Sequence, residues 1–267
     1  MLKIQTKITV FLIAVMLSAC GSLSEKADET KSWSASKLYA EAKDELNSGN
    51  YDKAIKYFEK LESRYPFGAY AQQAQMEVAY AYYRQNDQAQ CLAAVERFIR
   101  LHPNHANVDY MYYLRGLVNF KDKKSMFDFI SRQDPTERDP KAARDAFDAF
   151  KQLTDRFPNS KYAADATDRM RYLVQAMAQY EIHVANYYLQ RGAFLAAVNR
   201  AQTVVRDYPG SPSAQEALRI QVVAYEAMGL KELRDDAERV YQLNFKGNSA
   251  ASPRSKRAES AWWKFWN

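Results

Sequence analysis

The chain has 267 residues, of which 47% are hydrophobic, with only eight glycines and eight prolines. This composition allows a sizeable core, leaves few turns for a sheet, and favours an almost wholly helical protein. The formal net charge of +6 comes from the ends: Lys3 and Lys7 contribute +2 and the segment from Lys246 a net +4. The neutral remainder argues against a groove that binds nucleic acid directly, because such grooves normally carry a basic stripe.

Residues 1–19 have the pattern of a signal peptide. Lys3 and Lys7 precede a short apolar run, residues 8–17. A membrane-spanning helix needs about 20 apolar residues, so this run predicts a cleaved targeting segment rather than a spanning helix.

The sequence LSAC, ending at Cys20, matches a bacterial lipobox. In that motif the cysteine receives lipid and becomes the mature amino terminus; an ordinary secretory peptide with a chance cysteine is the alternative. Gly21 follows the cysteine where Asp would favour retention in the inner membrane, so we expect the outer membrane. Residues 20–35 are then a lipidated N-terminus and linker, and several acyl chains would make the anchor stable.

A sequence pattern that recurs along the chain predicts helical repeats. Residues 48–66 read as a turn, one amphipathic helix and a terminating proline, and similar phrases occupy residues 81–104, 141–159 and 187–210. The first two terminating prolines are 37 residues apart, close to the period of about 34 residues in tetratricopeptide repeats. The sequence therefore predicts an all-α tetratricopeptide solenoid of about five helix pairs.

The N-terminal repeat units are expected over residues 36–105. Ser36 is expected to cap a first helix at about 37–47, and Gly49 to provide the following turn. Ala54 is small enough to let the paired helices approach, and Cys91 occupies the same position in the second unit. We expect Cys91 to be a buried small hydrophobic residue that forms no intramolecular disulfide.

The C-terminal units are expected over residues 106–245. They begin with a helix at 108–120 in which Gly116 lies where two helices approach closely. An insertion at 121–140 and a long helix at 161–190 account for the longer spacing of the later prolines. A final helix pair is expected at about 212–228 and 231–245.

Residues 246–267 form a basic, Trp-rich tail in which the helical pattern stops. Three of the four tryptophans lie in the last six residues. They could dock on a partner or lie at a membrane interface, or the tail could be disordered without specific contacts.

The sequence contains no motif that indicates catalysis. It has no Gly-rich phosphate loop, no nucleophile elbow and no H-E-x-x-H pair. His102 and His105 are close in sequence, but no cysteine or carboxylate joins them at ligand spacing. We therefore predict a protein that is not an enzyme and that uses neither metal nor other cofactor.

Aromatic residues gather in the first two units and suggest a peptide-binding groove. Stacked helix pairs create an extended concave surface, and aromatic side chains in it would form adaptable pockets for an extended peptide with aromatic residues. Some of these side chains must be core. The candidates are Tyr65, Phe67, Tyr70, Tyr80, Tyr82 and Tyr83.

Together with the lipobox, five stretches resemble the BamD/ComL family of outer-membrane assembly lipoproteins: residues 64–75, 97–117, 138–150, 156–173 and 187–209. The resemblance implies a periplasmic scaffold anchored to the inner leaflet of the outer membrane. It implies that the C-terminal units bind the POTRA domains of a BamA-type β-barrel protein, alongside other lipoproteins of the BAM complex. It also implies that the N-terminal units recognise the C-terminal segments of unfolded outer-membrane proteins, which end in aromatic residues.

Two other functions are alternatives to an outer-membrane assembly scaffold. The ComL name records a cell-wall-associated competence lipoprotein that acts in DNA uptake, although an envelope defect could cause such a phenotype indirectly. A periplasmic enzyme on a helical scaffold would need a catalytic constellation, which the sequence lacks.

Arg200 is the candidate partner-binding residue. It lies off the apolar face of its helix, so the sequence suggests that it is not needed to fold the unit. A solvated surface arginine is the ordinary interpretation. Because the resemblance places partner docking in the C-terminal units, we expect Arg200 to pair with an acidic residue of the POTRA partner.

Overall fold

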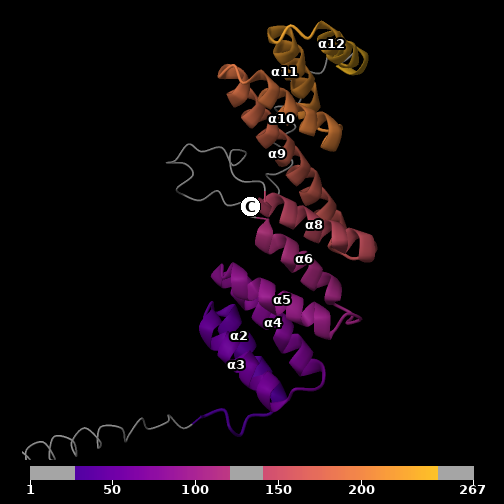
Figure 1. Ribbon diagram of the computed structural model, residues 1–267. Coiled ribbons are helices and arrows are strands. Elements are labelled where there is room, and N and C mark those ends of the chain that lie inside the picture. The colour runs from indigo at the N-terminus through magenta and orange to yellow at the C-terminus, as the bar shows by residue number, and fades with distance from the viewer. Residues whose placement is uncertain (1–27, 121–140, 246–267) are drawn as a thin grey trace, which may run out of the picture. The chain divides into compact units, whose positions relative to one another are not determined.

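The computed structural model describes residues 28–120 and 141–245, which contain ten helices and no strand (Figure 1). This confirms the expected all-α helical-repeat fold. The predicted signal peptide, Cys20, the predicted insertion at 121–140 and the tail at 246–267 lie outside the described residues. The chain forms two compact units, which divide between Ala74 and Gln75. The boundary predicted at residue 105 separates the units expected to bind substrate from the units expected to bind the partner, and it stays a prediction.

Unit 1, ending at Ala74, contains one helix pair and the start of a third helix. Helix α2 spans Ala35–Asn47, α3 spans Tyr51–Arg64, and α4 (Ala69–Gln85) begins here and continues into unit 2. Gly49 provides the turn between α2 and α3 with a positive φ of 81°, which costs a residue without a Cβ little.

The predicted cap of the first helix is wrong by two residues. Ser34 is the cap, because its side-chain oxygen accepts a hydrogen bond from the Lys37 N–H. Ser36 already lies inside α2, where its backbone is helical.

The core of unit 1 is the interface of α2 and α3. Buried apolar side chains repeat at helical spacing on both helices: Leu38, Ala42 and Leu46 on α2, and Ala54, Ile55, Phe58 and Leu61 on α3. Ala54 is fully buried, as its small size predicts.

Unit 2 contains the rest of α4 and seven further helices. These are α5 (Gln88–Leu101), α6 (Val108–Asn119), α8 (Lys141–Arg156), α9 (Ala163–Gln190), α10 (Phe194–Asp207), α11 (Ser213–Ala227) and α12 (Lys231–Phe245). Each packs on the next in this order, and α9 also contacts α11. Cys91 on α5 is fully buried, as expected, and burial with the nearby Asp87 charge raises its pKa to about 12.

Gly116 is the point of closest approach between α6 and α8. A Cβ at this position would lie 2.7 Å from Cζ of Phe150 and closer still to two other carbons of its ring. Phe150 is fully buried, so the ring cannot move aside into solvent. The close helix contact expected at Gly116 is therefore confirmed.

Helix α9 has 28 residues, close to the expected length, and is about 42 Å long at 1.5 Å per residue. Its N-terminal part, as far as Met177, contributes Leu173 and Met177 to a core shared with α5, α6 and α8. Its second half contributes Ile182 and Ala185 to a second core with α10 and α11. The long helix thus belongs to both of these cores.

Candidate functional site

Three of the six candidate aromatic residues lie close together in sequence, in the turn between α3 and α4 and in the first turn of α4. Pro66 disfavours a helical backbone at the preceding residue, so α3 ends at Arg64 and Tyr65 has a φ of −128°. Tyr65, Phe67 and Tyr70 are all exposed, and Phe67 has 90% of its surface accessible. We call these three residues the aromatic edge.

Part of the aromatic edge is supported by the core of unit 1. The Tyr70 ring lies 5.6 Å from that of Tyr39, which in turn packs 5.7 Å from the buried ring of Phe58. Tyr70 is thus held by a chain of ring contacts, while Phe67 projects into solvent. Phe67 thus offers an apolar ring that a bound ligand could bury.

The other three candidates, Tyr80, Tyr82 and Tyr83, lie in unit 2 and are partly buried. Tyr82 and Tyr83 pack against the core of α5 and α6, and the Tyr80 hydroxyl accepts a hydrogen bond from Arg84 at 2.9 Å. The six residues therefore belong to two units, and the core role expected for some of them fits Tyr82 and Tyr83.

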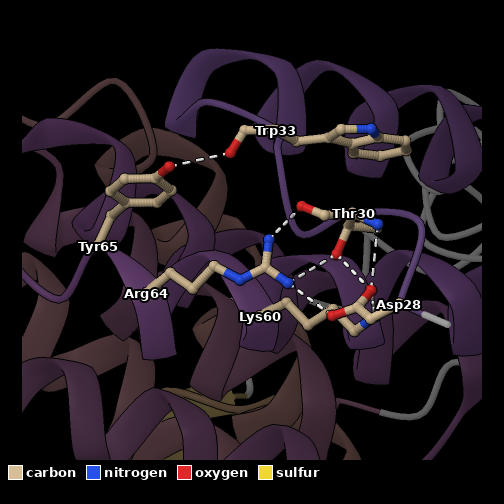
Figure 2. A network of polar contacts seen from close by, with 6 residues as sticks. All are labelled: Asp28, Thr30, Trp33, Lys60, Arg64 and Tyr65. Carbon is tan, nitrogen blue, oxygen red and sulfur yellow. Dashed lines mark hydrogen bonds and ion pairs between the residues drawn. The ribbon is translucent and has the colours of Figure 1, made fainter. Parts of the chain in front are cut away.

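A strap of six residues, Asp28 to Trp33, lies along α3 (Figure 2). The Asp28 carboxylate accepts hydrogen bonds from Lys60 Nζ at 2.7 Å and from Arg64 Nη2 at 2.6 Å. Arg64 also donates to the hydroxyl and the carbonyl of Thr30, which is only 3% exposed. The strap is therefore bound to the last turns of α3.

The other end of the strap reaches the aromatic edge. The Tyr65 hydroxyl donates to the Trp33 carbonyl at 2.9 Å, and the Trp33 ring packs edge-on against Tyr57 at 5.6 Å. Lys37 Nζ lies 4.7 Å from the centre of the Trp33 ring. The sequence interpretation missed the strap. The sequence feature that could have indicated the strap is Trp33, the one tryptophan outside the tail.

Arg200 lies on α10 and is paired within the chain. Its Nη1 donates to Oε2 of Glu181 on α9 at 3.2 Å. The Glu181 side chain is 4% exposed and that of Arg200 is 44% exposed. The expectation that Arg200 has no part in folding needs correction, because it compensates a buried carboxylate.

A family described as "Outer membrane lipoprotein" (YfiO) matches residues 31–240, which is most of the chain. The chain belongs to this family. This match, together with curated relatives named outer membrane protein assembly factor BamD, confirms the BamD/ComL resemblance seen in the sequence.

Curated relatives in the family match along nearly their whole length. The chain is 46% identical to the outer membrane protein assembly factor BamD of Neisseria meningitidis serogroup A, over 96% of this chain and 97% of that protein. It is 45% identical to the factor of the same name from Neisseria gonorrhoeae, with the same coverage, and 40% identical to that of Vibrio cholerae, over 85% of this chain and 95% of that protein.

In this member of the family, the last two helices and the turn between them carry exposed apolar side chains. Leu243 on α12 is 80% exposed. The other exposed apolar side chains of this region are Val223, Leu230, Leu233 and Val240. Within residues 28–120 and 141–245, no helix is long and apolar enough to cross a membrane.

Unit 2 also has an open pocket of about 360 Å³ beside the α5–α6 and α8–α9 turns. Its polar side chains are largely used by the fold: Ser160 donates to Asp109 at 2.6 Å, and Arg156 donates to the Tyr112 hydroxyl at 2.7 Å. His105 lines the pocket and, like His102, packs on Phe98. Among the described residues, no three His, Cys, Asp or Glu side chains gather as metal ligands.

Proposed function

We propose that this protein is a lipid-anchored periplasmic scaffold for the assembly of β-barrel proteins into the outer membrane. The observation that carries the proposal is the match, over nearly the full length, to relatives named outer membrane protein assembly factor BamD. A helical-repeat fold with exposed aromatic and apolar surfaces supports a binding role rather than catalysis.

The anchor in this proposal is Cys20. The LSAC motif supports acylation there, and the family description as outer-membrane lipoproteins supports the location at the outer membrane. Mass spectrometry of the mature amino terminus tests the modification, because acylation increases the mass of the peptide that begins at Cys20.

The partner in this proposal is a BamA-type β-barrel protein, bound through its POTRA domains by the C-terminal helices, with other lipoproteins of the complex alongside. The exposed apolar side chains of α11 and α12 supply area that a partner could bury. The exposed part of the Arg200 guanidinium, with donors besides the one used by Glu181, could bind a partner carboxylate.

Depleting the protein from its bacterium should lower the amount of folded β-barrel proteins in the outer membrane before any other envelope change. The reason is that a scaffold of barrel assembly acts upstream of every barrel. The measurement is a time course of heat-modifiable barrels on gels, with DNA uptake followed in parallel. Loss of DNA uptake while barrel levels stay constant would contradict the proposal.

The substrate site in this proposal is the aromatic edge of unit 1. Tyr65, Phe67 and Tyr70 offer exposed rings for the terminal aromatic residue of an unfolded barrel protein. A good aromatic pair contributes about 0.5–1.5 kcal/mol beyond area burial, enough to select one class of peptide end.

A photo-crosslinking residue placed at Phe67 should capture a peptide that ends in phenylalanine. Changing that terminal phenylalanine to alanine should reduce capture by about two- to tenfold, which is the effect of one lost aromatic pair. The same residue placed at Lys56, which is exposed on α3 away from the aromatic edge, is the matched control. Equal capture of both peptides at Phe67 would remove aromatic selectivity from this site.

A further inference from the structure

The strap is held most firmly at its first described residue. Asp28 accepts hydrogen bonds from the Thr30 N–H at 3.1 Å and the Thr30 hydroxyl at 2.7 Å, in addition to those from Lys60 and Arg64. We call the contacts of Asp28 and Thr30 with Lys60 and Arg64 the latch. Its parts lie more than 30 residues apart in sequence, so it is a tertiary contact and not a local turn.

The latch has features that a chance surface ion pair lacks. A lone pair of exposed charges stabilises little, since water screens it and two long side chains must be ordered. Here one carboxylate joins two cations, Arg64 donates to two groups of Thr30, and Thr30 is buried beneath them. Such a network orders the backbone at residues 28–30.

We infer that the latch is the point at which the lipid tether is fixed to the protein, so that it limits how far unit 1 can stand from the membrane. The inference rests on the proposed acylation of Cys20. Eight residue steps separate Cys20 from Asp28. At no more than about 3.6 Å per step, whatever their conformation, they reach at most about 29 Å.

Without the latch, the next fixed point is Trp33, whose ring and carbonyl contact Tyr57 and Tyr65. Thirteen steps then separate it from Cys20, with a reach of about 47 Å. The latch therefore shortens the maximum tether by about 18 Å. Arg64 directly precedes Tyr65, so the short tether keeps the α3 end that carries the aromatic edge close to the lipid.

Direct attraction of α3 to anionic lipid does not account for this arrangement. Lysines and an arginine do line one face of the helix, but Lys53 is paired with Glu45, and Lys60 and Arg64 are paired with Asp28. Glu45 and Asp28 offset part of this positive charge, and α3 itself adds the carboxylates of Asp52, Glu59 and Glu62. The short tether, rather than a basic surface, is what brings unit 1 to the membrane.

The latch should not respond to pH in the physiological range. Hydrogen bonds from Lys60 and then Thr30 hold the pKa of Asp28 well below its usual range. A lowered folded-state pKa means that the stabilising contribution is present above the unfolded pKa and is lost as pH falls through the folded pKa. The latch is therefore expected to persist between about pH 5 and pH 8 and to weaken in about 1 M salt.

The first experiment measures whether the latch holds the strap. Spin labels are placed at Lys31→Cys and Lys56→Cys in the full chain with Cys20→Ser and Cys91→Ala, so that no other thiol is labelled. Their distance distribution is measured by pulsed electron paramagnetic resonance. Asp28→Arg, which places three cations together, should replace one narrow peak with a broad distribution. Glu29→Arg makes the same charge change at the neighbouring exposed residue and should leave the peak narrow. A narrow peak in a folded Asp28→Arg protein would overturn the inference.

The second experiment measures the distance to the membrane. The acylated full chain, labelled with a donor dye at Lys56→Cys, is bound to phospholipid vesicles that carry an acceptor dye on the headgroups. Asp28→Arg should lower the energy transfer relative to both the parent and Glu29→Arg. The double variant Asp28→Arg with Arg64→Asp should restore the energy transfer, because it exchanges the two charges of the ion pair. Equal transfer in all variants would overturn the limit on distance. Failure of every variant to bind vesicles would overturn the anchoring itself, while the spin-label result would still report the latch.

Discussion

Replacing Gly116 by valine is expected to destabilise unit 2 by about 3 kcal/mol or more. The new Cβ would overlap the Phe150 ring, and the two γ-methyl groups would need further space between α6 and α8. Phe150 is fully buried and also contacts the Tyr113 and Phe120 rings at 6.0 Å, so the helices must separate to relieve the overlap. Denaturant unfolding of the purified protein measures the effect.

Gly210→Val is the matched control, because Gly210 lies in the same unit and a Cβ added there would have no neighbouring atom within 4 Å. Its free energy of unfolding should lie within about 0.5 kcal/mol of the parent's. Phe150→Ala should itself cost about 3–5 kcal/mol, yet should relieve part of the cost of Gly116→Val when the two are combined. Strict additivity of the two changes would show that the predicted overlap is not the cause.

Replacing Arg200 by glutamate is expected to cost about 2–4 kcal/mol of stability, which is less than for a fully buried pair because Arg200 is half-exposed. The change removes the cation that compensates the buried Glu181 and places a second carboxylate beside it. A thermal or denaturant melt measures this. Arg239→Glu, at an exposed ion pair on α12, should change stability by no more than about 0.5 kcal/mol.

Because Arg200→Glu would weaken both the fold and any partner contact, it cannot by itself test partner binding. The double variant Glu181→Gln with Arg200→Gln removes both charges and leaves two amides that can hydrogen-bond. It should melt close to the parent and still lose binding to the POTRA partner in a pull-down. Normal binding by this folded double variant would leave Arg200 with a structural role alone.

The helices of this protein follow from the sequence because their causes are local. Apolar residues at helical spacing place Ala54 and Phe58 in the core, and the prolines at the ends of the repeats stop the helices where the structure shows. The long helix and the close approach at Gly116 were also predictable, since an unbroken pattern and a glycine within a helix are both visible in the chain.

The polar contacts were decided by the tertiary structure. Asp28 and Arg64 are 36 residues apart, and Arg200 and Glu181 are 19 apart, so no helical spacing relates the partners. The six aromatic candidates look like one group in sequence, yet three belong to each compact unit. Helical periodicity depends on neighbours within a turn or two of the helix. The partner of a polar side chain depends instead on which distant helix packs opposite, and only the folded arrangement of the helices decides this.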